Sequence, residues 1–244
     1  MNINFENKRI LVTGAASGIG KGIATRLVQC GGTVIAVDRS EENLDKLKGE
    51  FPTVIPVAVD LGSWNEAQEK IKVVLPVDLL VNCAGLDIIQ SVGDITEDAF
   101  DKIFNVNIKG LVAVTQIVVN DLIQRNTPGS IVNISSQASL SGLLYQSLYC
   151  ASKGAVDAFT RALAMEVGPK KIRVNCVNPT IVMTELAIKA WSDPVRKQAV
   201  LDRIPLQRFA EIDEVVDVVL FLLSDRSSMV TGHCLAVDGG FLAA

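Results

Sequence analysis

The chain has very little histidine and no cysteine pattern of the kind that binds metal or forms a disulfide framework. Its single histidine, His233, leaves little scope for a site built from several histidines, so we expect no metal and look to other side chains for acid–base chemistry. The cysteine count is odd and no two cysteines have C-x-x-C spacing; they are Cys30, Cys83, Cys150, Cys176 and Cys234. Free thiols in a reducing compartment explain this better than disulfides.

Runs of one charge and long apolar stretches are also missing. The 23 basic and 27 acidic residues give a net charge of −4, and no Lys/Arg stripe is present, so we expect no nucleic-acid partner. No uninterrupted apolar stretch is long enough to cross a bilayer, and the first residues contain no apolar signal core. We therefore expect a protein without a membrane span, located in the cytoplasm.

What the sequence does contain is 49% hydrophobic residues, in short apolar runs that alternate with longer amphipathic ones. The short runs predict strands at about 9–12, 33–37, 54–59, 77–81, 130–134, 172–177 and 234–237. The longer segments predict helices at about 18–30, 41–50, 64–74, 100–124, 149–167 and 212–224. This alternation is typical of parallel strands joined by crossover helices. It predicts one α/β domain over 1–244, with a Rossmann-type doubly wound parallel sheet of about seven strands and helices on both faces.

A long stretch near the C-terminal third has no clear pattern of its own. The region from about 179 to 207 contains three prolines and reads as irregular. A loop of this length after a strand end is often functional, so we expect a lid over the substrate at about 180–207. An ordinary packed insertion is the alternative.

Three glycines follow the first predicted strand and open the first predicted helix. Gly14 permits a tight turn, Gly18 lets the backbone approach a phosphate, and Gly20 lets the helix pack against the strand. The start of the helix offers unpaired N–H groups to a pyrophosphate. In this context the glycines predict a dinucleotide site that also includes Ser17 and Ile19.

A carboxylate at the end of the second predicted strand bears on which dinucleotide binds. Asp38 is placed to accept hydrogen bonds from the adenosine ribose, and it would repel a 2′-phosphate. Arg39 could instead pair with such a phosphate, whereas Ser17 adds no positive charge. These residues favour NAD(H), with NADP(H) as the alternative. A turn or cap role for Asp38 is also open.

Two further strand ends are expected to lie beside the cofactor. Asp60 and Leu61 follow the third predicted strand, where a side chain can approach the adenine. Asn82, Ala84 and Gly85 follow the fourth, and small residues there allow the backbone to run close to the cofactor.

The expected chemistry centres on a tyrosine and a lysine four residues apart. Tyr149 and Lys153 share one face of a helix, and the ammonium would stabilise the phenolate. Tyr149 could then donate a proton to a carbonyl oxygen or accept one from an alcohol. Ser136, just after the fifth predicted strand, could hold the substrate oxygen. Any one of these residues alone would be read as structural.

Together, the motifs resemble the short-chain dehydrogenase/reductase family over essentially the whole chain. The matching segments are 13–20, 82–85, 105–107, 135–136, 149–153, 179–184 and 237–240. The resemblance implies that Ser136, Tyr149 and Lys153 are catalytic, with Asn107 completing a proton relay. Lys153 would also bind the nicotinamide ribose. Further implied cofactor contacts are Asn82, Val106, Tyr149, Pro179, Val182 and Thr184.

Within the family, the chain is similar to tetrameric carbonyl reductases that act on a ketose and on α-dicarbonyls with NADPH. The similarity implies a homotetramer and a substrate pocket formed by Ser136, Gln137, Leu143, Gln146, Tyr149 and Trp191. Three positions depart from that group. Ser17 replaces a basic residue and Asp38 is an added acid, which favours NAD(H). Gln146 replaces the histidine of the pocket.

These observations predict an oxidoreductase that moves hydride between a nicotinamide cofactor and a small carbonyl or alcohol. Leu143, Leu144 and Tyr145 favour a more apolar alcohol or ketone as the alternative substrate, whereas Gln137 and Gln146 favour a polar one. A non-catalytic nucleotide-binding scaffold is a third hypothesis. A complete catalytic set argues against it.

Overall fold

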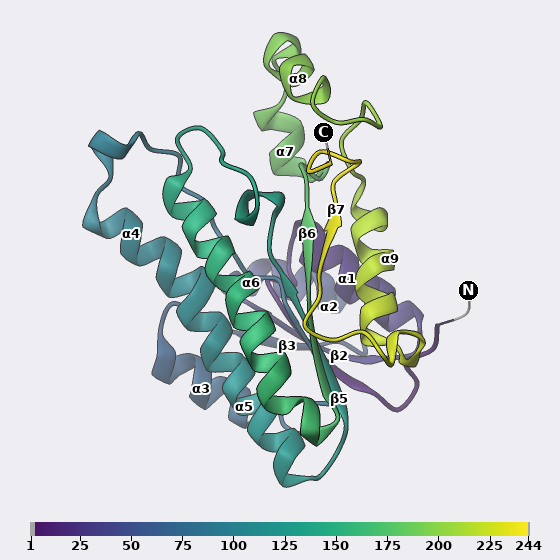
Figure 1. The fold of residues 1–244 in the computed structure, drawn as a ribbon. Coiled ribbons are helices and arrows are strands. Elements are labelled where there is room, and N and C mark those ends of the chain that lie inside the picture. Colours follow the sequence, from purple (N-terminus) through teal and green to yellow (C-terminus); the bar gives the residue numbers. More distant parts are fainter. Residues whose placement is uncertain (1–2, 244) are drawn as a thin grey trace.

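The computed structural model describes residues 3–243 and contains one parallel sheet covered by helices on both faces (Figure 1). Its strands are β1 (Arg9–Thr13), β2 (Thr33–Asp38), β3 (Ile55–Ala58), β4 (Leu79–Asn82), β5 (Gly129–Ile134), β6 (Ile172–Pro179) and β7 (Cys234–Val237). Their order is β3-β2-β1-β4-β5-β6-β7, and every neighbouring pair is parallel. The predicted doubly wound sheet of seven strands is confirmed.

Two sets of helices cover the two faces. Helices α1 (Gly18–Gln29), α2 (Glu41–Glu50) and α9 (Ile212–Leu223) share one hydrophobic cluster with the sheet. Helices α3 (Trp64–Lys72), α5 (Leu111–Gln124) and α6 (Ser147–Val167) share a second cluster on the other face. The remaining helices are α4 (Glu97–Phe104), α7 (Glu185–Ala190) and α8 (Pro194–Leu201).

The central strands are apolar along their whole length because both of their faces are buried. In β1, Ile10 and Val12 pack in the cluster with α1 and α9, while Leu11 between them packs in the cluster with α5. Full burial of each such side chain contributes about 1.5–3 kcal/mol. Two-sided burial is therefore what gives these strands continuous apolar runs rather than alternation.

The strand order reverses next to β1, and this reversal positions the site. The chain builds β1, β2 and β3 outward in one direction, then returns to place β4 on the other side of β1. The connections leaving β1 and β4 therefore diverge to opposite faces and open a crevice at the carboxyl ends of these strands. Ligands of doubly wound sheets bind at such a crevice.

The prediction of one regular helix at 100–124 is wrong in detail. The observed helical region begins at Glu97, and a π-helical segment at Asn105–Gly110 separates α4 from α5. A periodicity argument misses this segment because the wider turn is fixed by tertiary contacts. Asn107 bonds to the backbone of Leu86, and Gly110 lies so close to the Leu61 carbonyl that a Cβ would clash.

The prediction of an irregular segment at 179–207 is also wrong, because this segment contains two helices. Strand β6 extends to Pro179, and α7 and α8 then follow. Thr184 Oγ1 accepts the Ala187 N–H at 3.2 Å and caps α7, while Asp193 Oδ1 accepts the Val195 N–H at 2.9 Å and caps α8. Pro194 occupies the first turn of α8, where proline is well tolerated. Reading this proline as a loop marker, rather than as a helix start, caused the error.

One continuous helical region, Glu97–Gln124, is by its length and composition alone long and apolar enough to cross a membrane. Just over half of its most apolar window, 56%, is buried inside the protein. Residues Ala113, Val114 and Val118 of this region are completely buried in the cluster with the sheet. The apolar character of this helix is therefore explained by its packing on the sheet.

Candidate active site

The glycine loop after β1 forms a tight cradle at the carboxyl end of the sheet. Gly14 has a φ of +64°, and a Cβ on it would lie 2.9 Å from the backbone nitrogen of Ala84. A Cβ on Gly20 would overlap the carbonyl oxygen of Gly14. The predicted roles of these two glycines, in the turn and in helix packing, are thus confirmed by the contacts they make.

The start of α1 is suited to an anion. The helix begins at Gly18, its first turn carries no acidic side chain, and the Ser17 side chain makes no capping hydrogen bond. The N–H groups of this turn and the positive end of the helix dipole are therefore left for a negatively charged group. Binding of a pyrophosphate at this position stays a prediction.

Asp38 is fixed at the end of β2 beside this loop. Its Oδ2 accepts the Ala16 N–H at 3.1 Å, and its Oδ1 accepts the Ser40 N–H at 3.0 Å. The carboxylate therefore joins the glycine loop to the turn before α2. The adjacent Arg39 is exposed to solvent. A turn role for Asp38 is confirmed, and the geometry also holds its charge at the edge of the cradle.

The segment after β4 runs directly beside the glycine loop. Thr13 Oγ1 accepts the N–H groups of Cys83 at 3.0 Å and Ala84 at 3.1 Å. Asn82 donates from Nδ2 to Thr115 and Asn133, and its buried Oδ1 has no hydrogen-bond partner among the described residues. An orphaned acceptor beside the cradle fits a site that awaits a polar ligand or water.

Residues of the 180–207 segment reach the same cradle. A Cβ on Gly18 would lie 3.2 Å from Thr184 Cγ2, so Thr184 borders the glycine loop. Val182 forms an isolated bridge with Ala210 and is buried. Thr180, also buried, has an Oγ1 without a partner in the part of the chain that the structure describes.

The tyrosine and lysine expected to carry the chemistry lie together on α6. Lys153 is 5% exposed, and its Nζ donates to the carbonyl oxygen of Ile134 at 2.9 Å. The same Nζ lies 5.6 Å from the centroid of the Tyr149 ring. A Cβ on Gly85 would contact both Lys153 Nζ and Asn107 Oδ1 at 3.4 Å, which brings the β4 segment to this point.

Ser136 enters from the end of β5. Its Oγ accepts the Ala138 N–H at 3.1 Å, so the hydroxyl hydrogen is left for another partner. Its carbonyl accepts from Nδ2 of Asn178 at 3.2 Å, which fixes the backbone. The side chain is half-buried and so can be reached by a small molecule.

Asn107 ties three parts of the site together from the π-helical segment. Its Oδ1 accepts the Leu86 N–H at 2.8 Å, and its Nδ2 lies 2.9 Å from the Leu86 carbonyl and 3.0 Å from Ser152 Oγ. Ser152 Oγ in turn donates to the Tyr149 carbonyl at 2.8 Å. The structure therefore adds Ser152, which the sequence analysis missed. Its position just before Lys153 was the only available signal.

A polar pair lies at the outer rim of the site. Gln146 Nε2 donates to the carboxylate of Asp87, and the backbone carbonyl of Tyr145 accepts the Gln90 N–H at 2.9 Å. Asp87 is exposed as a residue, but partial burial of its carboxyl group raises the pKa, an effect opposed by the hydrogen bond from Gln146. Asp87 was not predicted, because no motif marks it. Leu143 is half-buried nearby in the chain.

Two residues assigned to the substrate pocket have structural surroundings of their own. Gln137 is only 3% exposed, and its Oε1 has no partner among the described residues. The Trp191 ring packs edge-on against Phe209 at 5.6 Å between centroids, and the Arg196 guanidinium lies over it at 4.8 Å. These contacts hold the Trp191 side chain between Phe209 and Arg196. Roles of either residue toward substrate stay predictions.

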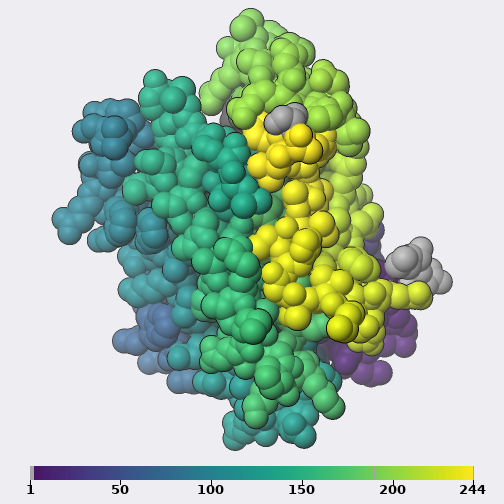
Figure 2. All heavy atoms as spheres, in the orientation of Figure 1, coloured from purple at the N-terminus to yellow at the C-terminus, as the bar shows by residue number. Residues whose placement is uncertain are grey.

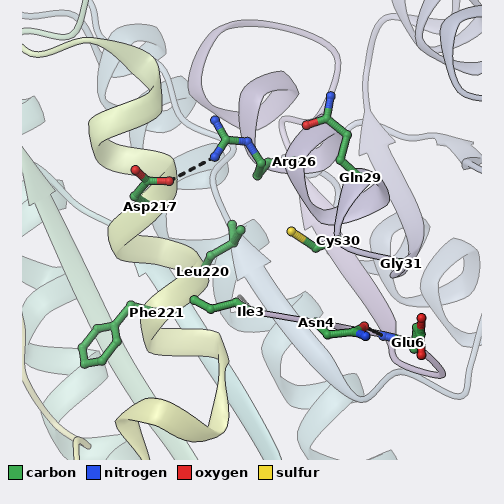
Figure 3. Close-up of a pocket in the computed structure, with 10 residues that line it drawn as sticks. All are labelled: Ile3, Asn4, Glu6, Arg26, Gln29, Cys30, Gly31, Asp217, Leu220 and Phe221. Atoms are coloured by element: carbon green, nitrogen blue, oxygen red, sulfur yellow. Dashed lines mark hydrogen bonds and ion pairs between the residues drawn. The ribbon is translucent and has the colours of Figure 1, made fainter. Parts of the chain in front are cut away.

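A separate surface pocket lies at the opposite end of the sheet (Figure 3). It is lined by the N-terminal segment, the end of α1 and one side of α9, and the Arg26–Asp217 ion pair at 3.1 Å borders it. Asn4 and Gly31, which line it, come before β1 and β2. The pocket is thus at the amino ends of the strands, away from the side chains predicted to be catalytic.

Comparison with known proteins identifies the family of the chain. A family model described as "Enoyl-(Acyl carrier protein) reductase" matches residues 14–242. L-xylulose reductase of Bos taurus is 51% identical, with 100% of both chains covered, and carbonyl reductase [NADPH] 2 of Sus scrofa is 44% identical over the same full extent. A gluconate 5-dehydrogenase from Burkholderia cenocepacia, solved with NADP and tartrate, superposes with a TM-score of 0.94 at 28% identity, covering 100% of this chain and 98% of that one.

Proposed function

Because the chain belongs to the short-chain dehydrogenase/reductase family of oxidoreductases, we propose that it acts on a small hydroxylated ketone or an α-dicarbonyl with Tyr149 as the proton-transfer residue. Hydride transfer between a nicotinamide cofactor and a carbonyl or alcohol is the activity of this family. The resemblance to L-xylulose reductases and carbonyl reductases is confirmed by similarity over the full length of the chain. A non-catalytic scaffold finds no support.

The observation that carries the proposal is the arrangement around Tyr149. Lys153 Nζ is close to the ring, so its positive charge stabilises the phenolate that forms when the hydroxyl gives up its proton. In reduction, the Tyr149 hydroxyl donates its proton to the substrate oxygen, and in oxidation the phenolate accepts one. Ser136, whose Oγ already accepts from Ala138, donates its own hydrogen to the same substrate oxygen.

Asn107 and Ser152 position Tyr149 through hydrogen bonds to the backbone. The Asn107 side chain joins the β4 segment to α6 through Ser152, which bonds to the Tyr149 carbonyl. The first turn of α6 is therefore held at a fixed distance from the end of β4. The nicotinamide supplies or accepts the hydride when bound, and this connection sets where Tyr149 stands relative to it.

For the cofactor we propose NAD(H), with NADP(H) as the alternative that several relatives suggest. The Sus scrofa enzyme is named for NADPH, and the Burkholderia cenocepacia structure contains NADP. In this chain Asp38 is held by the N–H groups of Ala16 and Ser40, so its charge cannot easily turn away from a ribose 2′-phosphate. A like-charge contact of this kind costs several kcal/mol.

The outer rim supports a hydroxylated substrate. Asp87 and Gln146 offer a carboxylate and an amide within reach of each other, and both can hydrogen-bond to substrate hydroxyls. The more apolar alternative relies on Leu143, Leu144 and Tyr145. Leu144 and Tyr145 are exposed at 77% and 55% and would be covered by an apolar substrate. A homotetramer in the cytoplasm, without a metal, stays our prediction.

A substrate and cofactor panel tests the proposal. The purified protein is mixed with NADH or NADPH and with L-xylulose, diacetyl or an apolar cyclic ketone, and oxidation of the nicotinamide is followed by its absorbance. We expect turnover of L-xylulose and diacetyl, faster with NADH. Turnover of the apolar ketone alone would replace the substrate assignment, and a preference for NADPH would replace the cofactor assignment.

A further inference from the structure

Two cysteines outside the catalytic set lie side by side at the edge of the sheet. Strands β6 and β7 lie side by side (Figure 1). Cys176 and Cys234 are register partners of this parallel pair, so their side chains point to the same face, toward α6. The two sulfur atoms and a carboxylate oxygen of Asp157 all lie within 4.8 Å of one another. Strand β7 has only β6 as a neighbour among the described strands.

The two thiols have different surroundings. Cys234 is half-buried, and the Arg161 guanidinium donates to its Sγ at 3.6 Å. The neighbouring Cys176 thiol and the charge of Arg161 lower the pKa of Cys234, against the opposing effects of partial burial and of the Asp157 charge. Figure 2 shows the C-terminal segment that holds β7, in yellow, at the molecular surface beside the green of α6. The half-buried sulfur of Cys234 is therefore within reach of a small oxidant.

Cys176 is fully buried and remains a thiol. Its S–H donates to Asp157 Oδ1 at 3.2 Å, and Asn178 Oδ1 lies at the same distance. The neighbouring Cys234 sulfur, burial and the negative charge of Asp157 all raise the pKa of Cys176. The pair thus combines one accessible, acidic thiol with one protected thiol that has a proton acceptor in place.

We propose that Cys234 and Cys176 are a peroxide-sensitive dithiol that forms a reversible disulfide between β6 and β7. Cys234 is the residue that reacts with a hydroperoxide, and Cys176 is the residue that resolves the product. Neither residue takes part in hydride or proton transfer, so this site is distinct from the proposed catalytic function.

The reaction balances in two steps. The Cys234 thiolate attacks an oxygen of the hydroperoxide, so that an S–O bond forms, the O–O bond breaks, and a sulfenic acid and an alkoxide or hydroxide result. The Cys176 sulfur then attacks the Cys234 sulfur while its proton passes to Asp157. The S–S bond forms, the S–O bond breaks, and the departing hydroxide takes the proton from Asp157 to give water. Two electrons pass from the sulfur pair to the peroxide.

The spacing of β6 and β7 allows a disulfide between Cys176 and Cys234, and strain in that disulfide would make it easy to reduce. Paired residues on neighbouring strands are about 4.8 Å apart, within the Cα separation that disulfides span. Directly opposed side chains on parallel strands must nevertheless move closer together, and a disulfide under such strain is easily reduced. An edge strand with one neighbour can make that adjustment.

Contacts from the cluster lead directly to the active site. Asn178 Nδ2 lies 3.0 Å from Asp157 Oδ2, 3.2 Å from the Ser136 carbonyl and 2.8 Å from Ser139 Oγ. Asp157 is also one turn beyond Lys153 on α6. When the Cys176 sulfur turns toward Cys234, Asp157 loses its thiol donor and Asn178 loses its sulfur neighbour. Oxidation should therefore shift the backbone that carries Ser136.

The first test measures the bond itself and does not depend on activity. The protein is treated with hydrogen peroxide in the presence of EDTA, its remaining thiols are alkylated, and its peptides are mapped by mass spectrometry without reduction. We expect two of the five cysteines to escape alkylation and one cross-linked pair to join the Cys176 and Cys234 peptides. Dithiothreitol should restore five alkylated cysteines. Five alkylated cysteines after peroxide, or a cross-link between other cysteines, would overturn the proposal.

Variants separate the two roles and the effect on the site. Cys176→Ser should stop at a sulfenic acid on Cys234 that dimedone traps, and Cys234→Ser should give neither product. Oxidised wild type should lose roughly threefold to tenfold in kcat and recover with dithiothreitol, whereas Cys176→Ser should not show this reversible loss. Cys150→Ser is the matched control, because Cys150 is adjacent to Tyr149. If Cys150→Ser alone protected the activity, the link from the disulfide to Ser136 would be refuted.

Discussion

The Nζ of Lys153 lies 5.6 Å from the centroid of the Tyr149 ring while donating a hydrogen bond to the Ile134 carbonyl. The ammonium is therefore anchored to the end of β5 and not free to follow the tyrosine. A fixed charge beside the ring stabilises the phenolate more than the phenol, which is what a reversible proton donor requires. This arrangement makes the assignment of Tyr149 directly testable.

Tyr149→Phe should reduce kcat by about 10²–10⁴-fold, the usual contribution of a general acid–base group, and leave cofactor affinity nearly unchanged. Steady-state rates and a fluorescence titration with the reduced nicotinamide measure the two quantities. Tyr145→Phe is the matched control, since these are the only two tyrosines in the chain. Full activity of Tyr149→Phe, or equal loss in both variants, would show that another group transfers the proton.

The hydrogen bonds of Asn107 predict a larger loss of activity in Asn107→Ala than in Ser152→Ala. Asn107→Ala leaves the Leu86 N–H and carbonyl and the Ser152 hydroxyl without their partner, so it should lower both kcat and stability, the latter by about 1–3 kcal/mol. Ser152→Ala removes the link between the Asn107 amide and the Tyr149 carbonyl but leaves both hydrogen bonds of Asn107 to Leu86, so it should mainly lower kcat, by a smaller factor. Chemical denaturation and initial rates separate the effects. A larger loss of activity in Ser152→Ala than in Asn107→Ala would contradict this order.

The sheet was predictable because its signal is local. The apolar runs of β1 and β5 record burial on both faces, and the glycine spacing after β1 records a close approach of backbone to backbone. The residues proposed as catalytic were identified from their order along such a sheet. Each of these patterns is formed by residues that are close together in the sequence.

What the sequence did not show depends on contacts between distant segments. The π-helical turn at Asn105–Gly110 is bonded to Leu86 and lies against Leu61, and Asp87 is joined to the candidate site only by its hydrogen bond with Gln146. The pairing of Cys176 with Cys234 likewise depends on the register of β6 and β7. None of these relationships has a sequence period or a spacing that could be recognised.

Gly20 provides a test of the cradle that does not involve catalysis. Because a Cβ there would overlap the Gly14 carbonyl, Gly20→Ala must displace α1 or the loop, and overpacking of this kind costs about 1–3 kcal/mol or more. Cofactor binding should weaken strongly as well. Gly49→Ala is the matched control, since nothing lies within 4 Å of its Cβ in α2 and alanine favours the helix. Thermal unfolding with and without cofactor should show opposite shifts for the two variants, and similar shifts would contradict the cradle.

Asp38 decides the cofactor preference in our proposal. Asp38→Ser removes the charge beside Ala16 and should shift the ratio of kcat/KM values toward NADPH by at least about tenfold. Asp45→Ser makes the same change in net charge at an exposed position of α2 and should leave the ratio unchanged. Initial rates with both cofactors at low substrate give the ratio. An unchanged preference in Asp38→Ser would remove the ribose role of this residue.

Asp87 should make substrate binding depend on pH. Its pKa is raised, chiefly by partial burial, so it loses its proton at a higher pH than an ordinary aspartic acid, whose pKa is about 3.9. Below that transition the group is a neutral acid, and above it a carboxylate that accepts hydrogen bonds from substrate hydroxyls. The KM for L-xylulose should therefore fall as the pH rises through the transition.

Diacetyl, which has no hydroxyl groups, should show no such change in KM, and Asp87→Asn should give a flat profile with L-xylulose. A raised pKa means that the ionised carboxyl group is disfavoured in the folded protein, so any penalty is present above the transition and disappears below it. Asp87→Asn should accordingly keep or slightly increase the Tm at neutral pH, which separates a binding defect from a folding defect. Equal pH profiles of KM for L-xylulose and diacetyl would show that Asp87 does not contact the substrate, and the hydroxylated-substrate assignment would then rest on Gln146 alone.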